Sequence, residues 1–209
     1  MKKIFKRLIT KVLIKTIQNQ RALAVWKKKD YLENGPQFVK EKIFEKYGIK
    51  DAFWVETGTY MGTTTLFLSQ KFPHVYSIEP GKELYQRAAH IFKGQNVTLF
   101  NDVSERVLPT LLPKLSGDCN FWLDGHYSAG VTFKGKKDCP VEDELNAIES
   151  NLRNFKKLAI LIDDVRCFLP SSNSKLSDYP SIDYLVDWAR RLNMRWRIEH
   201  DIFIIQKDN

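Results

Sequence analysis

Two glutamates stand at the ends of short apolar runs, where a ligand could reach them. Glu56 follows residues 52–55 and precedes a turn that contains Gly58 and Gly62, while Glu79 ends the next apolar run. In open α/β folds a nucleotide binds at the carboxyl ends of the strands, and an acid about 20 residues on holds its ribose. Two unrelated solvated acids are the alternative interpretation, but their joint occurrence at this spacing favours a binding site.

The glycine spacing indicates which kind of ligand this site would take. The turn reads Glu-x-Gly-x-x-x-Gly, whereas the Gly-x-Gly-x-x-Gly turn seats a pyrophosphate on a helix N-terminus. A carboxylate at the strand end suits instead a ligand that is cationic or that offers hydroxyl and amine groups. S-adenosylmethionine (SAM) carries a sulfonium and an ammonium group and no phosphate. The sequence therefore predicts SAM as the ligand.

Three aspartates end two later apolar runs. Asp124 follows residues 119–123, and Asp163 and Asp164 follow residues 158–162. If these runs are neighbouring parallel strands, about 5 Å apart, the three carboxylates repel one another unless a cation lies between them. Hard oxygen ligands favour Mg²⁺, with Mn²⁺ and Ca²⁺ as alternatives. One aspartate could instead cap a helix while another faces solvent, but three acids on two strand ends favour a metal site.

His126 lies two residues after Asp124, in the same loop. Beside a metal, a histidine can be a ligand or a general base, because its pKa lies near working pH. A lone histidine in a loop can also be neither, and the sequence leaves these alternatives open. His126 and Asp124 are the candidate catalytic residues.

To lie at one edge of a sheet, these acids must follow parallel strands that alternate with helices. Apolar runs expected to form seven strands lie at residues 52–55, 75–79, 97–100, 119–123, 158–162, 195–200 and 202–206. Helical patterns lie between them, for example at residues 82–92, 140–154 and 182–192. The last two runs are joined so tightly that they must pair antiparallel. The sequence therefore predicts an α/β three-layer sandwich with a mostly parallel seven-stranded sheet and a C-terminal antiparallel hairpin.

Length and cysteine usage bound the class of protein. The 209 residues suit one domain with a core of its own. The three cysteines have no paired spacing, which argues against a disulfide framework and a zinc site and favours a reducing compartment. We therefore expect a cytoplasmic protein.

The positive charge is confined to the N-terminal segment. Residues 1–29 hold ten Lys or Arg and no acid, while the rest of the chain carries 23 basic and 25 acidic side chains. Apolar residues of 1–17 fall on one helical face, and lysines interrupt the pattern too often for a membrane span. We expect a basic amphipathic arm at 1–34 before a domain at 35–209. We expect the arm to contact one of two kinds of surface. One is the inner face of an anionic membrane, and the other is protein, either the domain itself or a second copy in a homodimer.

Four motifs together resemble those of class I SAM-dependent methyltransferases. They are Glu-Thr-Gly-Thr-Tyr-Met-Gly at 56–62, Ile-Glu-Pro at 78–80, Leu-Asp-Gly-His at 123–126 and Leu-Ile-Asp-Asp at 161–164. Within that family the chain is similar to the metal-dependent O-methyltransferases. It resembles in particular the macrocin O-methyltransferase-like group, which methylates sugar hydroxyls, and more distantly catechol O-methyltransferase. The resemblance covers residues 50–206 and implies a Rossmann-like fold.

The resemblance also implies roles for single residues. The turn after the first strand would hold the methionine part of SAM, Glu79 the ribose, and Ser104 and Glu105 would lie near the adenine. The implied SAM-binding residues are Glu56, Thr57, Gly58, Thr59, Tyr60, Gly62, Thr63, Glu79, Ser104, Glu105 and Asp124. The implied metal ligands are Asp124, Asp163 and Asp164.

The loop after the fourth expected strand departs from both relatives. The sugar methyltransferases have Asp-Gly-Asp there, with the second aspartate as base, and this chain has His126 at that position. Catechol O-methyltransferase uses a lysine in this loop, and none stands at residues 125–129. The segment 132–145 belongs to neither pattern.

The implied reaction is metal-dependent methylation of a hydroxyl group on a sugar, a glycan or a glycosylated small molecule. Bound to the acceptor, the metal would lower the pKa of that hydroxyl. Two other classes stay open: a nucleic-acid methyltransferase, suggested by the basic arm, and a non-catalytic, membrane-recruited SAM-binding protein. The slightly acidic body and the lack of an Asn-Pro-Pro-Tyr-type motif argue against a nucleic-acid acceptor. The three aspartates argue for catalysis.

Overall fold

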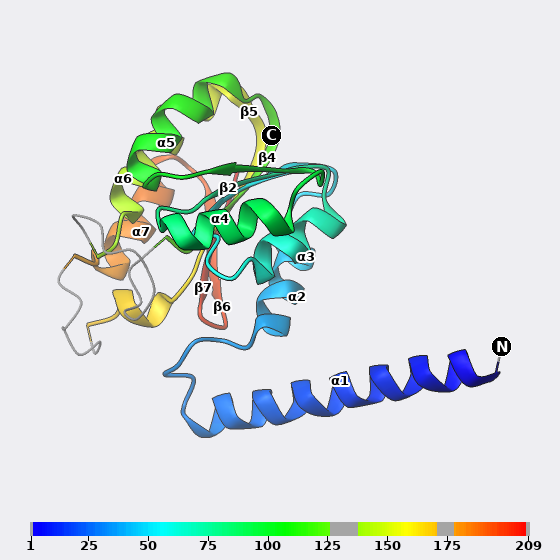
Figure 1. Ribbon diagram of the computed structural model, residues 1–209. Helices are drawn as coiled ribbons and strands as arrows, with labels where there is room; N and C mark the ends of the chain where they lie inside the picture. The colour runs from blue at the N-terminus through cyan, green and yellow to red at the C-terminus, as the bar shows by residue number, and fades with distance from the viewer. Residues whose placement is uncertain (1, 126–137, 171–177, 208–209) are drawn as a thin grey trace.

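A seven-stranded sheet lies at the centre of the molecule (Figure 1). The computed structural model describes residues 2–125, 138–170 and 178–207, with side chains from residue 14 onward. The strands are β1 (Phe53–Thr57), β2 (Val75–Ile78), β3 (Val97–Phe100), β4 (Gly117–Leu123), β5 (Phe155–Ile162), β6 (Arg195–Glu199) and β7 (Ile202–Lys207). Their order across the sheet is β3-β2-β1-β4-β5-β7-β6. Neighbours from β3 to β5 are parallel, and β7 is antiparallel to both β5 and β6.

Helices cover both faces of this sheet. They are α1 (Lys2–Lys28), α2 (Gln37–Tyr47), α3 (Thr63–Lys71), α4 (Lys82–Ile91), α5 (Ser104–Leu111), α6 (Val141–Glu149) and α7 (Ile182–Arg191). Among the described residues, three short 3₁₀ helices are η1 (Leu112–Lys114), η2 (Leu152–Asn154) and η3 (Val165–Phe168). One buried cluster packs α5, α6 and α7 on one face through Leu108, Leu145 and Leu185. The other packs α2 and α3 on the opposite face around Trp54 and Trp122. The predicted three-layer α/β sandwich is confirmed.

Element boundaries differ from the sequence pattern at several elements. β1 continues through Glu56 and Thr57, because these residues still pair with β2 and β4. β5 begins at Phe155, three residues before the expected run 158–162, and α6 ends at Glu149, five residues before the expected end of its helix. β4 begins at Gly117, two residues before the start of the predicted run 119–123. The division of the chain at residue 34 stays a prediction.

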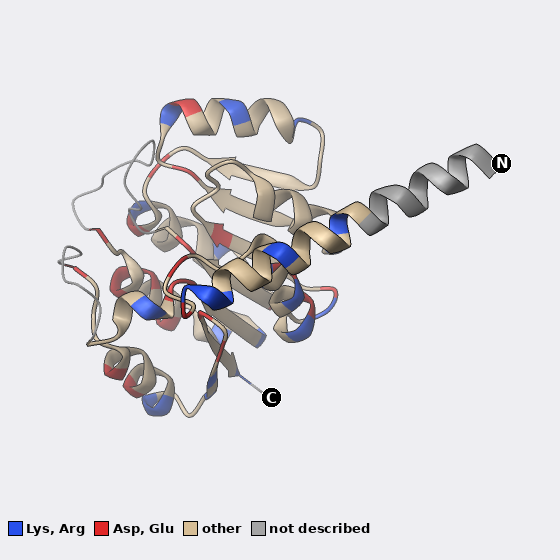
Figure 2. Ribbon diagram, turned by 90° about the horizontal axis from the view of Figure 1, so that it is seen from below, with Lys and Arg blue, Asp and Glu red and all other residues tan. Residues whose placement is uncertain are grey.

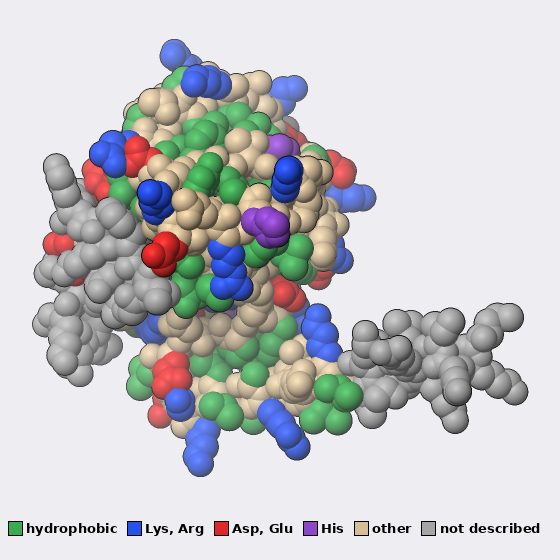
Figure 3. Space-filling view, in the orientation of Figure 1, with side chains coloured by type: hydrophobic (Ala, Val, Ile, Leu, Met, Phe, Trp, Pro, Cys, Tyr) green, Lys and Arg blue, Asp and Glu red, His purple; other side chains and the backbone are tan. Residues whose placement is uncertain are grey.

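Helix α1 stands off the sheet (Figure 1), and Figure 2, seen from below, shows Lys and Arg in blue along its described part. Its C-terminal end is anchored: Trp26 is buried, donates its indole N–H to the carbonyl oxygen of Glu33 at 2.7 Å, and packs edge-on against Tyr31. Every other described side chain of α1 is at least partly exposed. Figure 3 shows basic and apolar side chains together on its surface. Within the described residues, no helix has the length and apolar content needed to cross a membrane.

Candidate functional site

The strand order reverses between β1 and β4, and the loops after these strands meet there. In open α/β sheets a ligand binds outside the carboxyl ends of the strands at such a point. The backbone N–H of Asp124 donates to the carbonyl oxygen and to Oγ1 of Thr57, both at 3.2 Å. Gly58 follows with a φ of +88°, and a Cβ atom on it would lie 2.4 Å from the carbonyl oxygen of Asp124. The two loops reach this distance because residue 58 has no side chain.

Glu56 is fully buried at the end of β1. Its Oε2 accepts hydrogen bonds from the hydroxyls of Thr65 and Ser77, each at 2.6 Å, and its Oε1 has no hydrogen-bond partner among the described residues. Burial raises the pKa of Glu56 to about 7. The two hydrogen bonds lower the pKa, but they offset the effect of burial only in part. The carboxyl group thus joins β1 to α3 and β2. Its predicted contact with the methionine part of SAM stays a prediction.

Glu79 joins the turns that follow β1 and β2. Its Oε2 accepts the backbone N–H of Tyr60 at 2.7 Å, and its Oε1 accepts that of Gly81 at 2.8 Å. Burial raises the pKa of Glu79, and the two amide hydrogen bonds oppose that shift. A hollow of 620 Å³ lies beside it, lined by Tyr60, Met61, Gly81, Lys82, Glu83, Leu84 and Arg87. The predicted ribose-binding residue therefore organises the backbone that borders this hollow.

The remaining residues of the predicted SAM turn gather between Glu56 and α3. Thr59 is buried, and its hydroxyl lies 2.6 Å from that of Ser77. Tyr60 has a φ of +48° and an exposed side chain. Gly62 precedes α3 at a φ of +79°, and Thr63 is the exposed first residue of that helix. The structure thus brings Thr57, Gly58, Thr59, Tyr60, Gly62 and Thr63 to one edge of the sheet.

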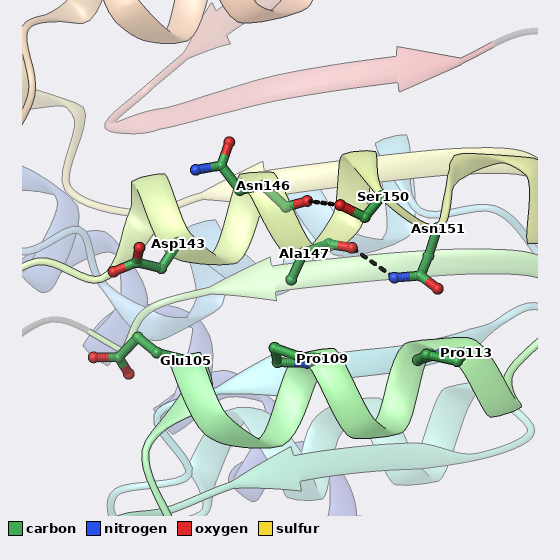
Figure 4. Close-up of a pocket in the computed structure, with 8 residues that line it drawn as sticks. All are labelled: Glu105, Pro109, Pro113, Asp143, Asn146, Ala147, Ser150 and Asn151. Atoms are coloured by element: carbon green, nitrogen blue, oxygen red, sulfur yellow. Dashed lines mark hydrogen bonds between the residues drawn. The ribbon is translucent and has the colours of Figure 1, made fainter.

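Ser104 and Glu105 lie at the first turn of α5, and the hydroxyl of Ser104 donates to Glu105 at 3.2 Å. Glu105 also lines a groove of 720 Å³ between α5 and α6. Figure 4 shows that this groove extends from Glu105 and Asp143 to Pro113 and Asn151 along the two helices. It contains none of the other described residues predicted for the site. The groove is therefore not the candidate active site, and the adenine contacts stay a prediction.

The carboxylates of Asp124 and Asp163 share one lysine. As predicted, β4 and β5 are parallel neighbours, and the N–H of Asp163 donates to the carbonyl oxygen of Leu123 at 3.1 Å. Lys40 of α2 donates from Nζ to Oδ2 of Asp163, and the same Nζ lies 3.9 Å from Oδ2 of Asp124. Burial lowers the pKa of Lys40, but the charges of Asp124 and Asp163 outweigh burial and raise it overall. Lys40 is therefore an ammonium group.

Asp164 forms an ion pair with a different cation, Arg166. Its φ is +58°, and its Oδ1 accepts a hydrogen bond from Nη1 of Arg166 at 2.6 Å. The same guanidinium also donates to Asp201 and to the side chain of Asn34. Asp201 in turn accepts the backbone N–H of Arg166 at 2.9 Å. Arg166 thus ties Asp164 to the turn between β6 and β7 and to the segment before α2.

This arrangement does not fit the predicted metal centre of Asp124, Asp163 and Asp164. Across the part of the chain that the structure describes, no group of three or more His, Cys, Asp or Glu is placed to hold a metal ion. Lys40 lies between two of the carboxylates, and Arg166 binds the third. The acids do meet at one edge, but each of them already has a cationic side chain as a partner. The predicted base His126 lies outside the described residues.

Lys40 and Arg166 are the site residues that sequence reasoning missed. Lys40 lies in the middle of the buried stripe of α2, which also contains Val39, Ile43 and Phe44. A lysine in a buried helical stripe needs a partner of opposite charge, because an isolated buried charge is costly. That signal could have identified Lys40, although not its partner, which is 123 positions away.

No protein-family model and no curated protein matches this sequence. Solved structures do match. A methyltransferase from Geobacter sulfurreducens gives a TM-score of 0.55 at 10% identity, over 91% of this chain and 87% of that one. The Escherichia coli protein yhhF, assigned as a methyltransferase, gives 0.51 at 16% identity over 85% and 90%. The 23S rRNA methyltransferase ErmE gives 0.51 at 12% identity over 83% and 68%. The chain therefore shares the fold of methyltransferases of known structure.

Proposed function

We propose that this protein transfers the methyl group of SAM to a hydroxyl group of a sugar, a glycan or a glycosylated small molecule. The observation that carries the proposal is the meeting of the β1 and β4 loops at the point where the strand order reverses. The turn held by Glu79 borders this point on one side, and the carboxylates of Asp124 and Asp163 border it on the other. A cationic methyl donor and a polyhydroxyl acceptor suit these two sides.

Methyl transfer needs a methyl donor, an acceptor hydroxyl and a base. The acceptor oxygen attacks the methyl carbon, the bond between carbon and sulfur breaks with its electrons moving to sulfur, and the hydroxyl proton goes to a base. Asp124 is the partly exposed carboxylate of the cluster, whereas Asp163 is almost fully buried. Asp124 therefore fits the role of a residue that contacts the acceptor. Holding donor and acceptor in line supplies much of the rate.

The first test is binding of SAM and of its demethylated product to the full chain, measured by calorimetry. Glu79→Ala removes the acceptor of the Tyr60 and Gly81 N–H groups and should weaken binding roughly 5- to 150-fold, the effect of losing about 1–3 kcal/mol.

The matched control is Glu45→Ala, which removes an exposed glutamate that pairs only with Lys71 among the partners the structure shows for it. This control should leave the affinity unchanged. Folded wild-type protein that produces no heat with either ligand contradicts the proposal. Binding without methyl transfer to any hydroxyl acceptor favours the non-catalytic alternative.

A nucleic-acid acceptor is the second candidate function, and the basic helix α1 supports it. Residues 1–29 carry ten Lys or Arg without an acid, which is the electrostatic footprint of a phosphate-binding segment. Binding of ribosomal RNA that weakens steeply with salt, together with methylation of that RNA, would favour this candidate over a sugar acceptor.

We also propose that α1 binds the surface of an anionic membrane. Ile14, Ile17, Leu23 and Val25 are exposed among the lysines and arginines of this helix. An exposed helix that carries both kinds of side chain binds through buried apolar area and through attraction to anionic lipids. Each basic residue near such a surface adds about 1 kcal/mol.

Deleting residues 2–22 should abolish sedimentation of the protein with vesicles that contain phosphatidylglycerol. The deletion keeps Trp26, which anchors the end of α1, so the body should stay folded and its affinity for SAM should not change. The full chain should not sediment with neutral phosphatidylcholine vesicles. A deletion that converts a dimer to a monomer and leaves vesicle binding intact would make α1 a contact between two copies instead.

A further inference from the structure

Lys40 is a buried charged residue beside the candidate site. It lies on α2 with Val39 on one side and Ile43 and Phe44 one turn further on, and all four side chains are buried. The ammonium group lies 5.4 Å from the centre of the Trp122 ring, close enough for a cation–π contact. Burial at this position removes the hydration shell of the ammonium group, which is unfavourable, so the lysine needs partners of opposite charge.

Those partners are the two carboxylates that end β4 and β5. Nζ of Lys40 donates to Oδ2 of Asp163 and lies 3.9 Å from Oδ2 of Asp124. The other oxygen of Asp163, Oδ1, is buried and has no hydrogen-bond partner among the described residues. The ammonium group therefore sits at the position between two neighbouring strand ends where a cation was predicted.

We propose that the ammonium group of Lys40 is the resident cation of this carboxylate pair and takes the place of a divalent metal ion. An ammonium group offers three N–H donors. One donates to Asp163, and the two others can hold Asp124 and an oxygen of the acceptor. The contact with the acceptor rests on the proposed function, whereas the identity of the cation does not.

A fixed ammonium group and a divalent metal ion exclude each other at this site. Both would occupy the space between Asp124 and Asp163, and two positive charges a few ångström apart repel strongly in a buried setting. Arg166 pairs with the third carboxylate, Asp164, whereas Lys40 is the cation beside Asp124 and Asp163. Removing the charge of Lys40 should therefore turn the two carboxylates into a metal site.

The experiment compares Mn²⁺ binding to the full chain and to three single variants, by calorimetry and by the electron paramagnetic resonance signal of free Mn²⁺. Lys40→Met should bind Mn²⁺ at least about tenfold more tightly than the wild type. Lys40→Arg keeps a positive charge at the site and should not gain affinity. Lys42→Met is the matched control, because Lys42 lies on the same helix with its side chain exposed, and it should behave as the wild type.

A comparison of Mn²⁺ binding by the wild type and by Asp163→Asn protects the test if Lys40→Met does not fold. Tight binding of Mn²⁺ by the wild type that disappears in Asp163→Asn would overturn the proposal, because a metal ion would then displace Lys40. Folded Lys40→Met that gains no affinity for Mn²⁺ overturns it as well. These outcomes do not depend on methyl transfer. If transfer to a hydroxyl acceptor is found, it should persist at full rate in excess chelator.

Discussion

Gly58→Ala should abolish SAM binding and strongly lower the free energy of unfolding. The alanine Cβ would lie 2.4 Å from the carbonyl oxygen of Asp124 and 3.0 Å from its carbonyl carbon, so two backbone segments would have to separate. The φ of +88° adds conformational strain, which costs about 1–3 kcal/mol for a residue with a side chain. Because the loops after β1 and β4 form the point where the ligand is proposed to bind, affinity and stability should fall together. Denaturant unfolding and calorimetry with SAM measure the two effects.

Gly94→Ala is the matched control for this variant. Gly94 also has a positive φ, +75°, but no described atom lies within 4 Å of the Cβ that alanine would add. It should show the conformational cost alone, about 1–3 kcal/mol, and leave SAM binding unchanged. Equal losses of stability in the two variants would contradict the close approach of the two loops.

Glu56→Gln should remove a pH dependence of about 3 kcal/mol from the free energy of unfolding. The folded protein raises the pKa of Glu56 from 4.5 to about 7, mainly through burial. Between these two values the folded state binds more protons than the unfolded state. The contribution of Glu56 is therefore fully present below pH 4.5 and is lost as the pH rises through 7. Glutamine does not titrate, so the variant should gain stability relative to the wild type over this range.

The measurement is a series of denaturant unfolding curves of both proteins between pH 4.5 and pH 8. The pKa values of Asp163 and Asp201 are also raised by burial, but both proteins share these groups, so their contributions cancel in the difference. Glu45→Gln, which changes an exposed glutamate, is the matched control. A constant difference for Glu56→Gln would mean that Glu56 titrates in the folded protein as it does in the unfolded chain.

The sequence was sufficient to predict the architecture because each strand carries a local signal. Apolar runs that end in an acid, such as the ones before Asp124 and Asp163, identified the parallel strands and the edge at which they end. The pairing of β4 with β5 then brought the carboxylates together as expected. The tight connection between the last two runs was enough to predict their antiparallel pairing.

The charge partners could not be predicted, because they depend on contacts between distant parts of the chain. Lys40 lies 123 positions before Asp163, and Asn34 lies 132 positions before Arg166. A repulsive cluster of acids predicts a compensating cation, but not whether that cation is a metal ion or a side chain. Glu56 shows the same limit, since its hydroxyl partners Thr65 and Ser77 come from two other elements.

The position of β7 has a consequence for synthesis of the protein. β7 is the last strand in the sequence, yet it lies between β5 and β6, and the turn before it supplies Asp201 to Arg166. Until residues 202–207 leave the ribosome, the apolar strand β5 has an open edge, which is a template for pairing with other chains. At about 5–20 residues per second, the nascent chain passes through this stage on every round of translation. We therefore expect chaperones that bind extended apolar segments to engage β5 before the carboxylate cluster can assemble.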